Sequence, residues 1–174
     1  GSGSYGTVVK VRHKKTKQVF ACKALPVKRL TPHFLNKVHA EIEIMKEIDH
    51  PSITRLREVF FMDRNVYLVM DLCEGGELFQ LLTSAPSSRF QSTITSASGR
   101  GFREEVVRIM LVDMLSALRF IHQRGIVHRD LKLENFLFDQ PPTSMDTLSL
   151  RLIDFGLSKY FAQDECIRNV VGSS

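Results

Sequence analysis

The feature that most constrains the fold is the alternation of β-branched and polar residues near the start of the chain. Over residues 7–25, two apolar runs at 8–11 and 19–22 flank a lysine-rich segment at 14–17. Alternation with a period of two is typical of a β-strand, and a short polar segment between two such runs is typical of a turn. The sequence therefore predicts a strand, a hairpin and a second strand in this region.

A helix and a further pair of strands are predicted next. Thr31 is a suitable N-cap and Pro32 a suitable first-turn residue for a helix that runs to about Ile48. Two strand-like runs follow at 53–61 and 65–70. We therefore expect the first half of the chain to form a mostly antiparallel sheet with one helix.

The second half is predicted to be mainly helical, which makes the fold class α+β. A short helix at 77–82 leads into a Ser- and Thr-rich segment at 83–101, which we interpret as a surface insertion or a disordered loop. Residues 103–123 carry apolar side chains on nearly every side, and a helix of this kind is normally buried. Loops, short strands and a second polar insertion at 139–147 follow.

Composition excludes several classes of protein. Charged residues make up 25% and hydrophobic residues 43%, which indicates a globular chain, and no apolar run approaches the roughly 20 residues that span a bilayer. The net charge of +5 is concentrated in the first third, where lysines cluster in the predicted, solvated turn at 14–17, so we expect no nucleic-acid partner. The 3 cysteines lack CxxC spacing, which favours a reducing, cytoplasmic setting over a disulfide framework or a zinc site.

A glycine-rich segment opens the chain and fits the pattern GxGxxGxV. Glycines let backbone amides approach phosphate oxygens because no Cβ stands in the way. A dinucleotide-binding loop would lead into a helix and carry an acid about 20 residues later. Here the glycines lead into a predicted strand, and Lys23 stands at the comparable distance. Taken alone, the pattern also fits a flexible loop that binds no ligand.

Lys23 is the lone charge in an otherwise apolar strand, on the same face as Ala21. A buried ammonium group needs a partner. Glu41 is the candidate, because it lies within an apolar stripe of the predicted helix that includes Val38 and Met45. Alternatively, both side chains reach water at the edges of their elements. Beside a glycine loop, we favour a lysine that contacts nucleotide phosphates and a glutamate that positions it.

The run His128-Arg129-Asp130-Leu131-Lys132-Leu133-Glu134-Asn135, followed by Asp154-Phe155-Gly156, carries the most specific chemistry. Asp130 is a candidate base for a substrate hydroxyl, and Asn135 and Asp154 are candidate magnesium ligands through hard oxygen atoms. An aspartate in a loop is more often a turn residue. As an ordered set, however, these groups are the parts that phosphoryl transfer needs.

In this order and spacing, the glycine loop, strand lysine, helix glutamate and the two later motifs resemble the eukaryotic protein kinases. Lys132 is the residue typical of serine/threonine kinases, and 67–79 and 153–159 resemble the calcium-dependent and calmodulin-dependent group. The resemblance implies a bilobal fold: an N-lobe and hinge at 1–73, and at 74–174 a partial C-lobe with the catalytic loop, the Asp-Phe-Gly motif and the start of the activation segment. The insertions near 83–101 and 139–147 would belong to this C-lobe.

The resemblance also implies roles for individual residues. Asp130, Lys132, Lys23 and Glu41 would be catalytic, and Asn135 and Asp154 would hold Mg²⁺. Met70 would be the gatekeeper and 71–73 the hinge. Val8, Ala21 and Leu137 would enclose adenine, and Met45, Leu56, His128 and Phe155 would stack as a spine. Ser173 would contact Asp130 and Lys132. The implied nucleotide-binding residues are Gly1, Ser2, Gly3, Ser4, Tyr5, Gly6, Val8, Ala21, Lys23, Met70, Asp71, Cys73, Glu77, Glu134 and Leu137.

The activity implied is that of an ATP- and Mg²⁺-dependent kinase that phosphorylates Ser and Thr hydroxyls of protein substrates. A calcium-sensing regulatory region would lie outside this chain, which contains no EF-hand pattern. The sequence also ends before the Ala-Pro-Glu motif of the family, so we expect little peptide phosphorylation from these 174 residues alone. The alternative is a pseudokinase or truncated interaction module that binds nucleotide or a partner without turnover. Intact Lys23, Asp130, Asn135 and Asp154 argue against a decayed site.

Overall fold

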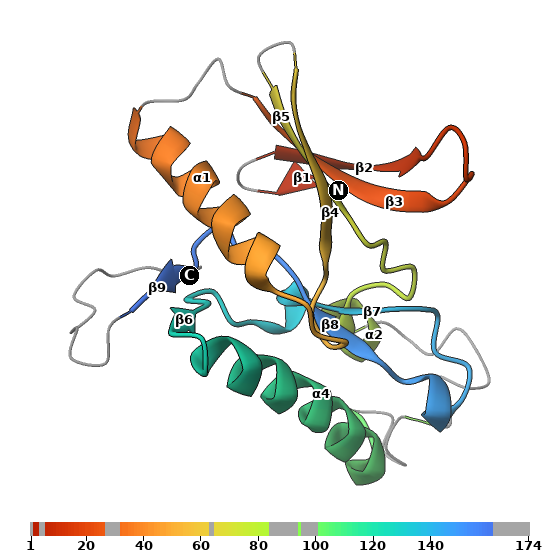
Figure 1. Cartoon of the computed structure of the whole chain (residues 1–174). Coiled ribbons are helices and arrows are strands. Elements are labelled where there is room, and N and C mark those ends of the chain that lie inside the picture. Colours follow the sequence, from red (N-terminus) through yellow and green to blue (C-terminus); the bar gives the residue numbers. More distant parts are fainter. Residues whose placement is uncertain are drawn as a thin grey trace.

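The computed structural model describes residues 2–3, 6–26, 32–62, 65–83, 94 and 101–161. Figure 1 shows two parts: a sheet with one helix across it, and a mainly helical part below. This is the predicted α+β arrangement. The expected N-cap Thr31, the loop residues Gly1, Ser4 and Tyr5, Ser173 and most of the insertion at 83–101 lie outside the described residues.

The first part is a five-stranded antiparallel sheet with the order β1-β2-β3-β5-β4. The predicted hairpin is confirmed, because β2 and β3 pair along their length, with Val8 opposite Lys23 and Lys10 opposite Ala21. The strands are β1 (Ser2–Gly3), β2 (Gly6–Arg12), β3 (Val19–Pro26), β4 (Leu56–Met62) and β5 (Asn65–Met70).

Helix α1 (Pro32–Glu47) lies across the sheet, close to its predicted bounds. Val38 and Ile42 of α1 are buried in a cluster with Leu25 of β3 and Leu68 of β5. The apolar stripe of the helix therefore packs on the sheet face that also carries Lys23. This packing brings Glu41 to the same face.

The prediction that a strand begins at Ile53 is wrong, since β4 begins at Leu56. Ile53 is fully buried and forms a parallel bridge with Leu152 of the second part. Two backbone hydrogen bonds flank this bridge: Thr54 N–H donates to Leu152 O over 3.0 Å, and Leu152 N–H donates to Ser52 O over 2.9 Å. An apolar, β-branched residue fits any pleated neighbour, and here the neighbour comes from the second part of the structure.

The second part holds the remaining elements around one long helix. The strands β7 and β8 pair antiparallel, as do β6 and β9. Its elements are α2 (Leu78–Thr83), α4 (Glu104–His122), β6 (Ile126–Val127), the 3₁₀ turn η2 (Leu133–Asn135), β7 (Phe136–Phe138), η3 (Met145–Thr147), β8 (Leu150–Leu152) and β9 (Lys159–Tyr160). The predicted polar insertion at 139–147 contains η3.

Helix α4 confirms the predicted helix but not its predicted burial. Val106, Met110, Ala117 and Ile121 are buried, whereas Val112 is 68% exposed and Leu115 is 61% exposed. The described residues pack against one side of the helix only, and the opposite apolar side faces solvent. Among these residues, no helix is both long and apolar enough to cross a membrane.

One hydrophobic core joins the two parts. It runs from Ile44 at the end of α1, through Ile53, to Ile121 of α4, Leu152 of β8 and Phe155. The segments that carry Glu41 and Asp154 therefore share a single packed interior. Their relative position follows from this packing.

Candidate active site

A cavity of about 390 Å³ opens between the sheet and the second part. Val8 of β2, Ala21 of β3 and Met70 of β5 line it from the sheet, and Leu137 of β7 lines it from the second part. Val8, Ala21 and Leu137 are the residues that were expected to enclose adenine, and Met70 is the expected gatekeeper. Gly6, Asp71, Cys73 and Glu77, which were also predicted as binding residues, line the same cavity.

The segment 71–73, which was expected to form the hinge, lines the cavity and is fixed through the side chain of Asp71. Arg57 of β4 donates two hydrogen bonds to the Asp71 carboxylate, over 2.6 Å and 3.0 Å, and Arg151 of β8 lies 3.4 Å from its Oδ2. Asp71 thus joins a strand from each part. The neighbouring Cys73 thiol is half-buried, and burial raises its pKa.

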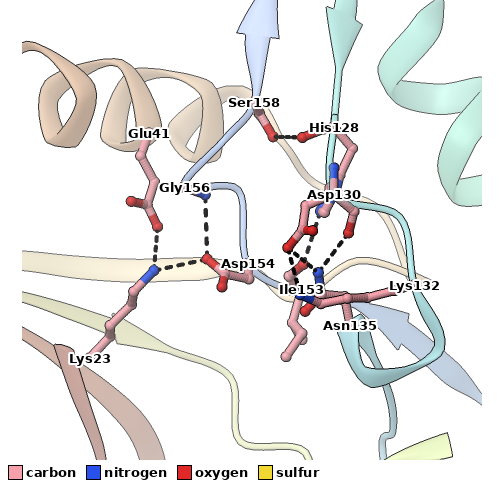
Figure 2. Close-up of polar contacts among 10 residues, drawn as sticks. All are labelled: Lys23, Glu41, His128, Asp130, Lys132, Asn135, Ile153, Asp154, Gly156 and Ser158. Carbon is pink, nitrogen blue, oxygen red and sulfur yellow. Dashed lines mark hydrogen bonds and ion pairs between the residues drawn. The ribbon is translucent and has the colours of Figure 1, made fainter. Parts of the chain in front are cut away.

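Lys23 lies at the centre of the polar wall. Its Nζ is 2.8 Å from Oε1 of Glu41 and 3.0 Å from Oδ1 of Asp154, so β3, α1 and the segment after β8 meet at this ammonium group (Figure 2). Burial alone would lower the pKa of Lys23, but the two carboxylates outweigh it and the pKa is raised. The lysine is therefore held as a cation, which is the state that binds phosphate.

Asp154 and Arg129 adopt left-handed backbone conformations, with φ values of 59° and 66°. Such a conformation costs a non-glycine residue roughly 1–3 kcal/mol and persists only where the surroundings enforce it. For Arg129 the surroundings include a 2.6 Å hydrogen bond from its Nε to the carbonyl oxygen of Leu157. Arg129 is thus held in its uncommon backbone geometry by the segment that follows the Asp-Phe-Gly motif.

Asp130 is the centre of a second polar cluster beside the cavity (Figure 2). Lys132 Nζ lies 3.0 Å from its Oδ2. Asn135 Nδ2 donates to the Asp130 carbonyl over 2.7 Å and to its Oδ2 over 3.0 Å. The Asp130 carboxylate is therefore fixed by the Lys132 ammonium group and the Asn135 amide. Asn135 also lines the cavity, so it connects this cluster to the cavity.

His128 ties this cluster to the segment that carries Asp154. It is buried, its Nε2 lies 3.0 Å from the Ile153 carbonyl, and its ring meets that of Phe155 edge-on at 5.0 Å. Its Nδ1 accepts a 3.4 Å hydrogen bond from the Asp130 N–H, which requires a neutral ring with the proton on Nε2. In agreement, burial lowers the pKa of His128.

Comparison with known proteins gives the family. The protein kinase domain family matches residues 1–174. The chain belongs to the protein kinase domain family. It is 36% identical to calcium-dependent protein kinase 14 of Arabidopsis thaliana and 36% identical to calcium-dependent protein kinase 5 of Plasmodium berghei. Each alignment covers 99% of this chain, which spans 30% of the first relative and 27% of the second.

The structure describes most of the kinase signature residues that were predicted from the sequence. Most of them meet at the cavity or in the Asp130 cluster beside it. Glu134 lies apart from them, exposed in η2, and is not among the cavity residues. Of the glycine loop, Ser2 and Gly3 form the short strand β1, and Gly6 packs so closely on β3 that a Cβ there would overlap the carbonyl oxygen of Ala24.

The donor set at the cavity of this kinase domain fits a magnesium ion. Asn135 and Asp154 both line the cavity and offer hard oxygen atoms. Both hydrogen bonds of the Asn135 side chain use its amide nitrogen, which leaves the amide oxygen as the atom that can bind a metal ion. Within the described residues there is no group of three or more His, Cys, Asp or Glu side chains suited to a metal ion. Magnesium commonly takes one or two protein ligands together with substrate phosphates, so this sparse set is adequate.

Sequence reasoning missed two residues that line the cavity, Thr54 and Ile153. Thr54 lies beside the bridge residue Ile53, and Ile153 lies between β8 and Asp154. Both are next to buried apolar residues. The signal that could have found them is the alternation of faces along an extended segment, which places the neighbours of a buried residue on the opposite side.

Proposed function

We propose that the protein carrying this chain is an ATP- and Mg²⁺-dependent serine/threonine protein kinase. It would transfer the γ-phosphoryl group of ATP to Ser and Thr hydroxyls of protein substrates. The observation that carries the proposal is the meeting of Glu41 and Asp154 on Lys23, beside the Asp130 cluster. Similarity to relatives that are named calcium-dependent protein kinases supports it.

In this proposal, residues 1–73 and 74–174 are two lobes that enclose the nucleotide. Val8, Ala21 and Leu137 hold adenine, and the hinge backbone at 71–73 hydrogen-bonds its edge. Lys23 and the glycine loop bind phosphate oxygens, and Glu41 keeps the Lys23 ammonium in place. The walls then fix the nucleotide in one orientation, and orientation is a major part of catalysis in phosphoryl transfer.

The chemical step would take place at Asp130. Its carboxylate accepts the proton of the substrate hydroxyl as the oxygen attacks the γ-phosphorus, and the bond from that phosphorus to the ADP oxygen breaks. Lys132, 3.0 Å from Asp130, places a positive charge near the transferring group. Mg²⁺ held by Asn135 and Asp154 would neutralise negative charge on the phosphates.

We also propose that calcium regulation, the property named in the relatives, resides in a region outside residues 1–174. The proposed setting is the cytoplasm, which the free thiols of Cys22 and Cys73 support. Calcium titration of activity in the full-length protein and imaging of its tagged form test these two points.

The deciding experiment is Asp130→Asn in the full-length protein. The substitution keeps the size of the side chain but removes its basicity, so phosphate transfer should fall at least about 100-fold while ATP binding stays nearly unchanged. Transfer is measured with a Ser/Thr peptide library and binding with calorimetry. Glu104→Gln on the exposed surface of α4 is the control. Normal turnover by the Asp130→Asn variant would show that Asp130 is not the base.

A further inference from the structure

Helix α4 carries an acid in the middle of its buried side. Asp113 falls between Met110 and Ala117 in the stripe that also holds Val106 and Ile121. All four apolar residues are buried. Asp113 itself is partly buried, so its carboxylate needs hydrogen-bond donors where water does not reach it.

Two donors from separate segments satisfy Asp113. Ser52 Oγ donates to Oδ1 over 3.1 Å, and the backbone N–H of Leu150 donates to Oδ2 over 2.8 Å. Ser52 and Leu150 are both buried. One carboxylate thus holds the loop between α1 and β4 with one oxygen and the start of β8 with the other.

These two segments are also joined to each other. The Ser52 carbonyl accepts the Leu152 N–H over 2.9 Å, and Ile53 forms its bridge with Leu152. Asp113 therefore completes a junction of α4, the α1–β4 loop and β8. A hydrogen bond to a carboxylate is roughly twice as strong as a neutral one, and the 2.8 Å contact with the Leu150 N–H has the length typical of such a bond.

The junction is connected through the chain to both partners of Lys23, Glu41 and Asp154. The α1–β4 loop follows the helix that carries Glu41, and β8 leads into Asp154. A shift of the loop against β8 would move Glu41 and Asp154 relative to each other. The ammonium group could not then stay 2.8 Å from one carboxylate and 3.0 Å from the other.

We propose that Asp113 is a positioning residue for the active site, which rests on the proposed kinase function. By fixing the α1–β4 loop to β8, it sets the separation of Glu41 and Asp154 and hence the position of Lys23 at the phosphates. It acts through these residues and touches no substrate. The competing explanation is that Asp113 only satisfies two buried donors and stabilises the fold.

Asp113→Asn in the full-length protein separates these explanations. Asparagine keeps the size of the side chain and one acceptor oxygen but carries no charge. That oxygen can accept from the Leu150 N–H, whereas its NH₂ group can only donate to the Ser52 hydroxyl, so both contacts lose their charge assistance. Val106→Ala, which removes buried apolar volume from the same helix, is the control matched for stability. The probe is an acyl-phosphate derivative of ATP, which acylates a lysine held beside the phosphates.

The expected result is that acylation of Lys23 and kcat each fall about tenfold or more in Asp113→Asn, and by far less in Val106→Ala at an equal loss of Tm. Amide hydrogen exchange without nucleotide should speed up at Thr54, Leu150 and Leu152 in the first variant only. Equal effects of the two variants on all three readouts would overturn the proposal.

Ser52→Ala provides a second test, because it removes one of the two contacts and leaves the Leu150 hydrogen bond intact. A smaller loss of acylation in the same direction is expected, and unchanged acylation would contradict the proposal even if Asp113→Asn fails to fold. The proposed kinase function fails separately: in that case the unsubstituted protein would show neither acylation nor transfer. The exchange measurement would then still decide whether Asp113 fixes the junction.

Discussion

The exchange Glu41→Gln tests how much the buried ion pair contributes to the stability of the fold. Lys23 is 8% exposed and Glu41 is 6% exposed, and Nζ and Oε1 lie 2.8 Å apart. Glutamine keeps the shape and one acceptor oxygen but removes the negative charge. Lys23 would then depend on Asp154, whose side chain is 39% exposed and therefore partly screened by water.

The size of the effect follows from what remains after the exchange. Removing one member of a buried ion pair costs roughly 3–5 kcal/mol when the other charge is left unpaired. Lys23 keeps Asp154 and a hydrogen bond to the amide oxygen, so the loss should be closer to that of one charge-assisted hydrogen bond, about 1.5–3 kcal/mol. The pKa of Lys23 should also fall, because the first of its two raising charges is gone.

The matched control is the pair between Arg108 and Glu104 on α4. These groups are closer, at 2.6 Å, but their side chains are 76% and 78% exposed. Glu104→Gln should therefore cost at most about 0.5 kcal/mol, since water screens the pair. The two variants thus test whether the burial of an ion pair or the distance between its charged atoms determines its contribution to stability.

The assay is urea unfolding followed by circular dichroism at pH 7, with the midpoint and slope fitted for both variants. Glu41→Gln should lower the midpoint at an unchanged slope, as expected when stability changes and the exposed surface does not. If Glu41→Gln cost no more than Glu104→Gln, the reasoning from burial would be wrong. Lys23 and Glu41 would then each be adequately solvated despite their position.

Two further predictions concern a close backbone contact and a buried base. Gly75→Ala should destabilise the protein by several kcal/mol, because a Cβ at this position would overlap the backbone carbonyl of Gln140 and the side chain of Phe138; unfolding midpoints near those of the unsubstituted protein would contradict this. Burial lowers the pKa of His128 below 6.5, so the free energy of unfolding should fall as the pH drops below about 6.5, by up to about 1.4 kcal/mol per pH unit. His128→Asn should reduce this slope in urea unfolding between about pH 5 and 7, leaving the part due to His50, whose pKa burial also lowers; equal slopes would refute the assignment.

The sheet and its helix could be predicted because their signals are local. The alternation around Val8 and Lys23 predicts the β2–β3 pair, and the apolar stripe around Glu41 predicts the helix face that packs on it. Lys23 and Glu41 could also be matched, since two opposite charges in apolar surroundings require each other. Local pattern and charge therefore predicted the Lys23–Glu41 pair in the polar wall of the cavity.

Features that depend on distant neighbours could not be predicted. Ile53 has the composition of a strand residue, yet its partner is Leu152 in the other lobe. The burial of α4 depends on what packs around it, and Val112 shows that an apolar side can remain uncovered. The left-handed backbone of Asp154 is a conformation that aspartate adopts only occasionally, so the residue type alone does not predict it.

Glu41 and Asp113 show where the limit of sequence reading lies. Each acid interrupts an apolar helical stripe, so the signal for a buried partner is the same in both helices. For Glu41 the partner is a lysine, which is equally conspicuous in its strand. For Asp113 the partners are the Ser52 hydroxyl and the Leu150 backbone N–H, and neither is unusual in a sequence. An isolated acid within an apolar helical stripe therefore indicates that hydrogen-bond donors from other segments meet it. These donors should be sought among buried hydroxyls and the backbone N–H groups at strand ends as well as among cations.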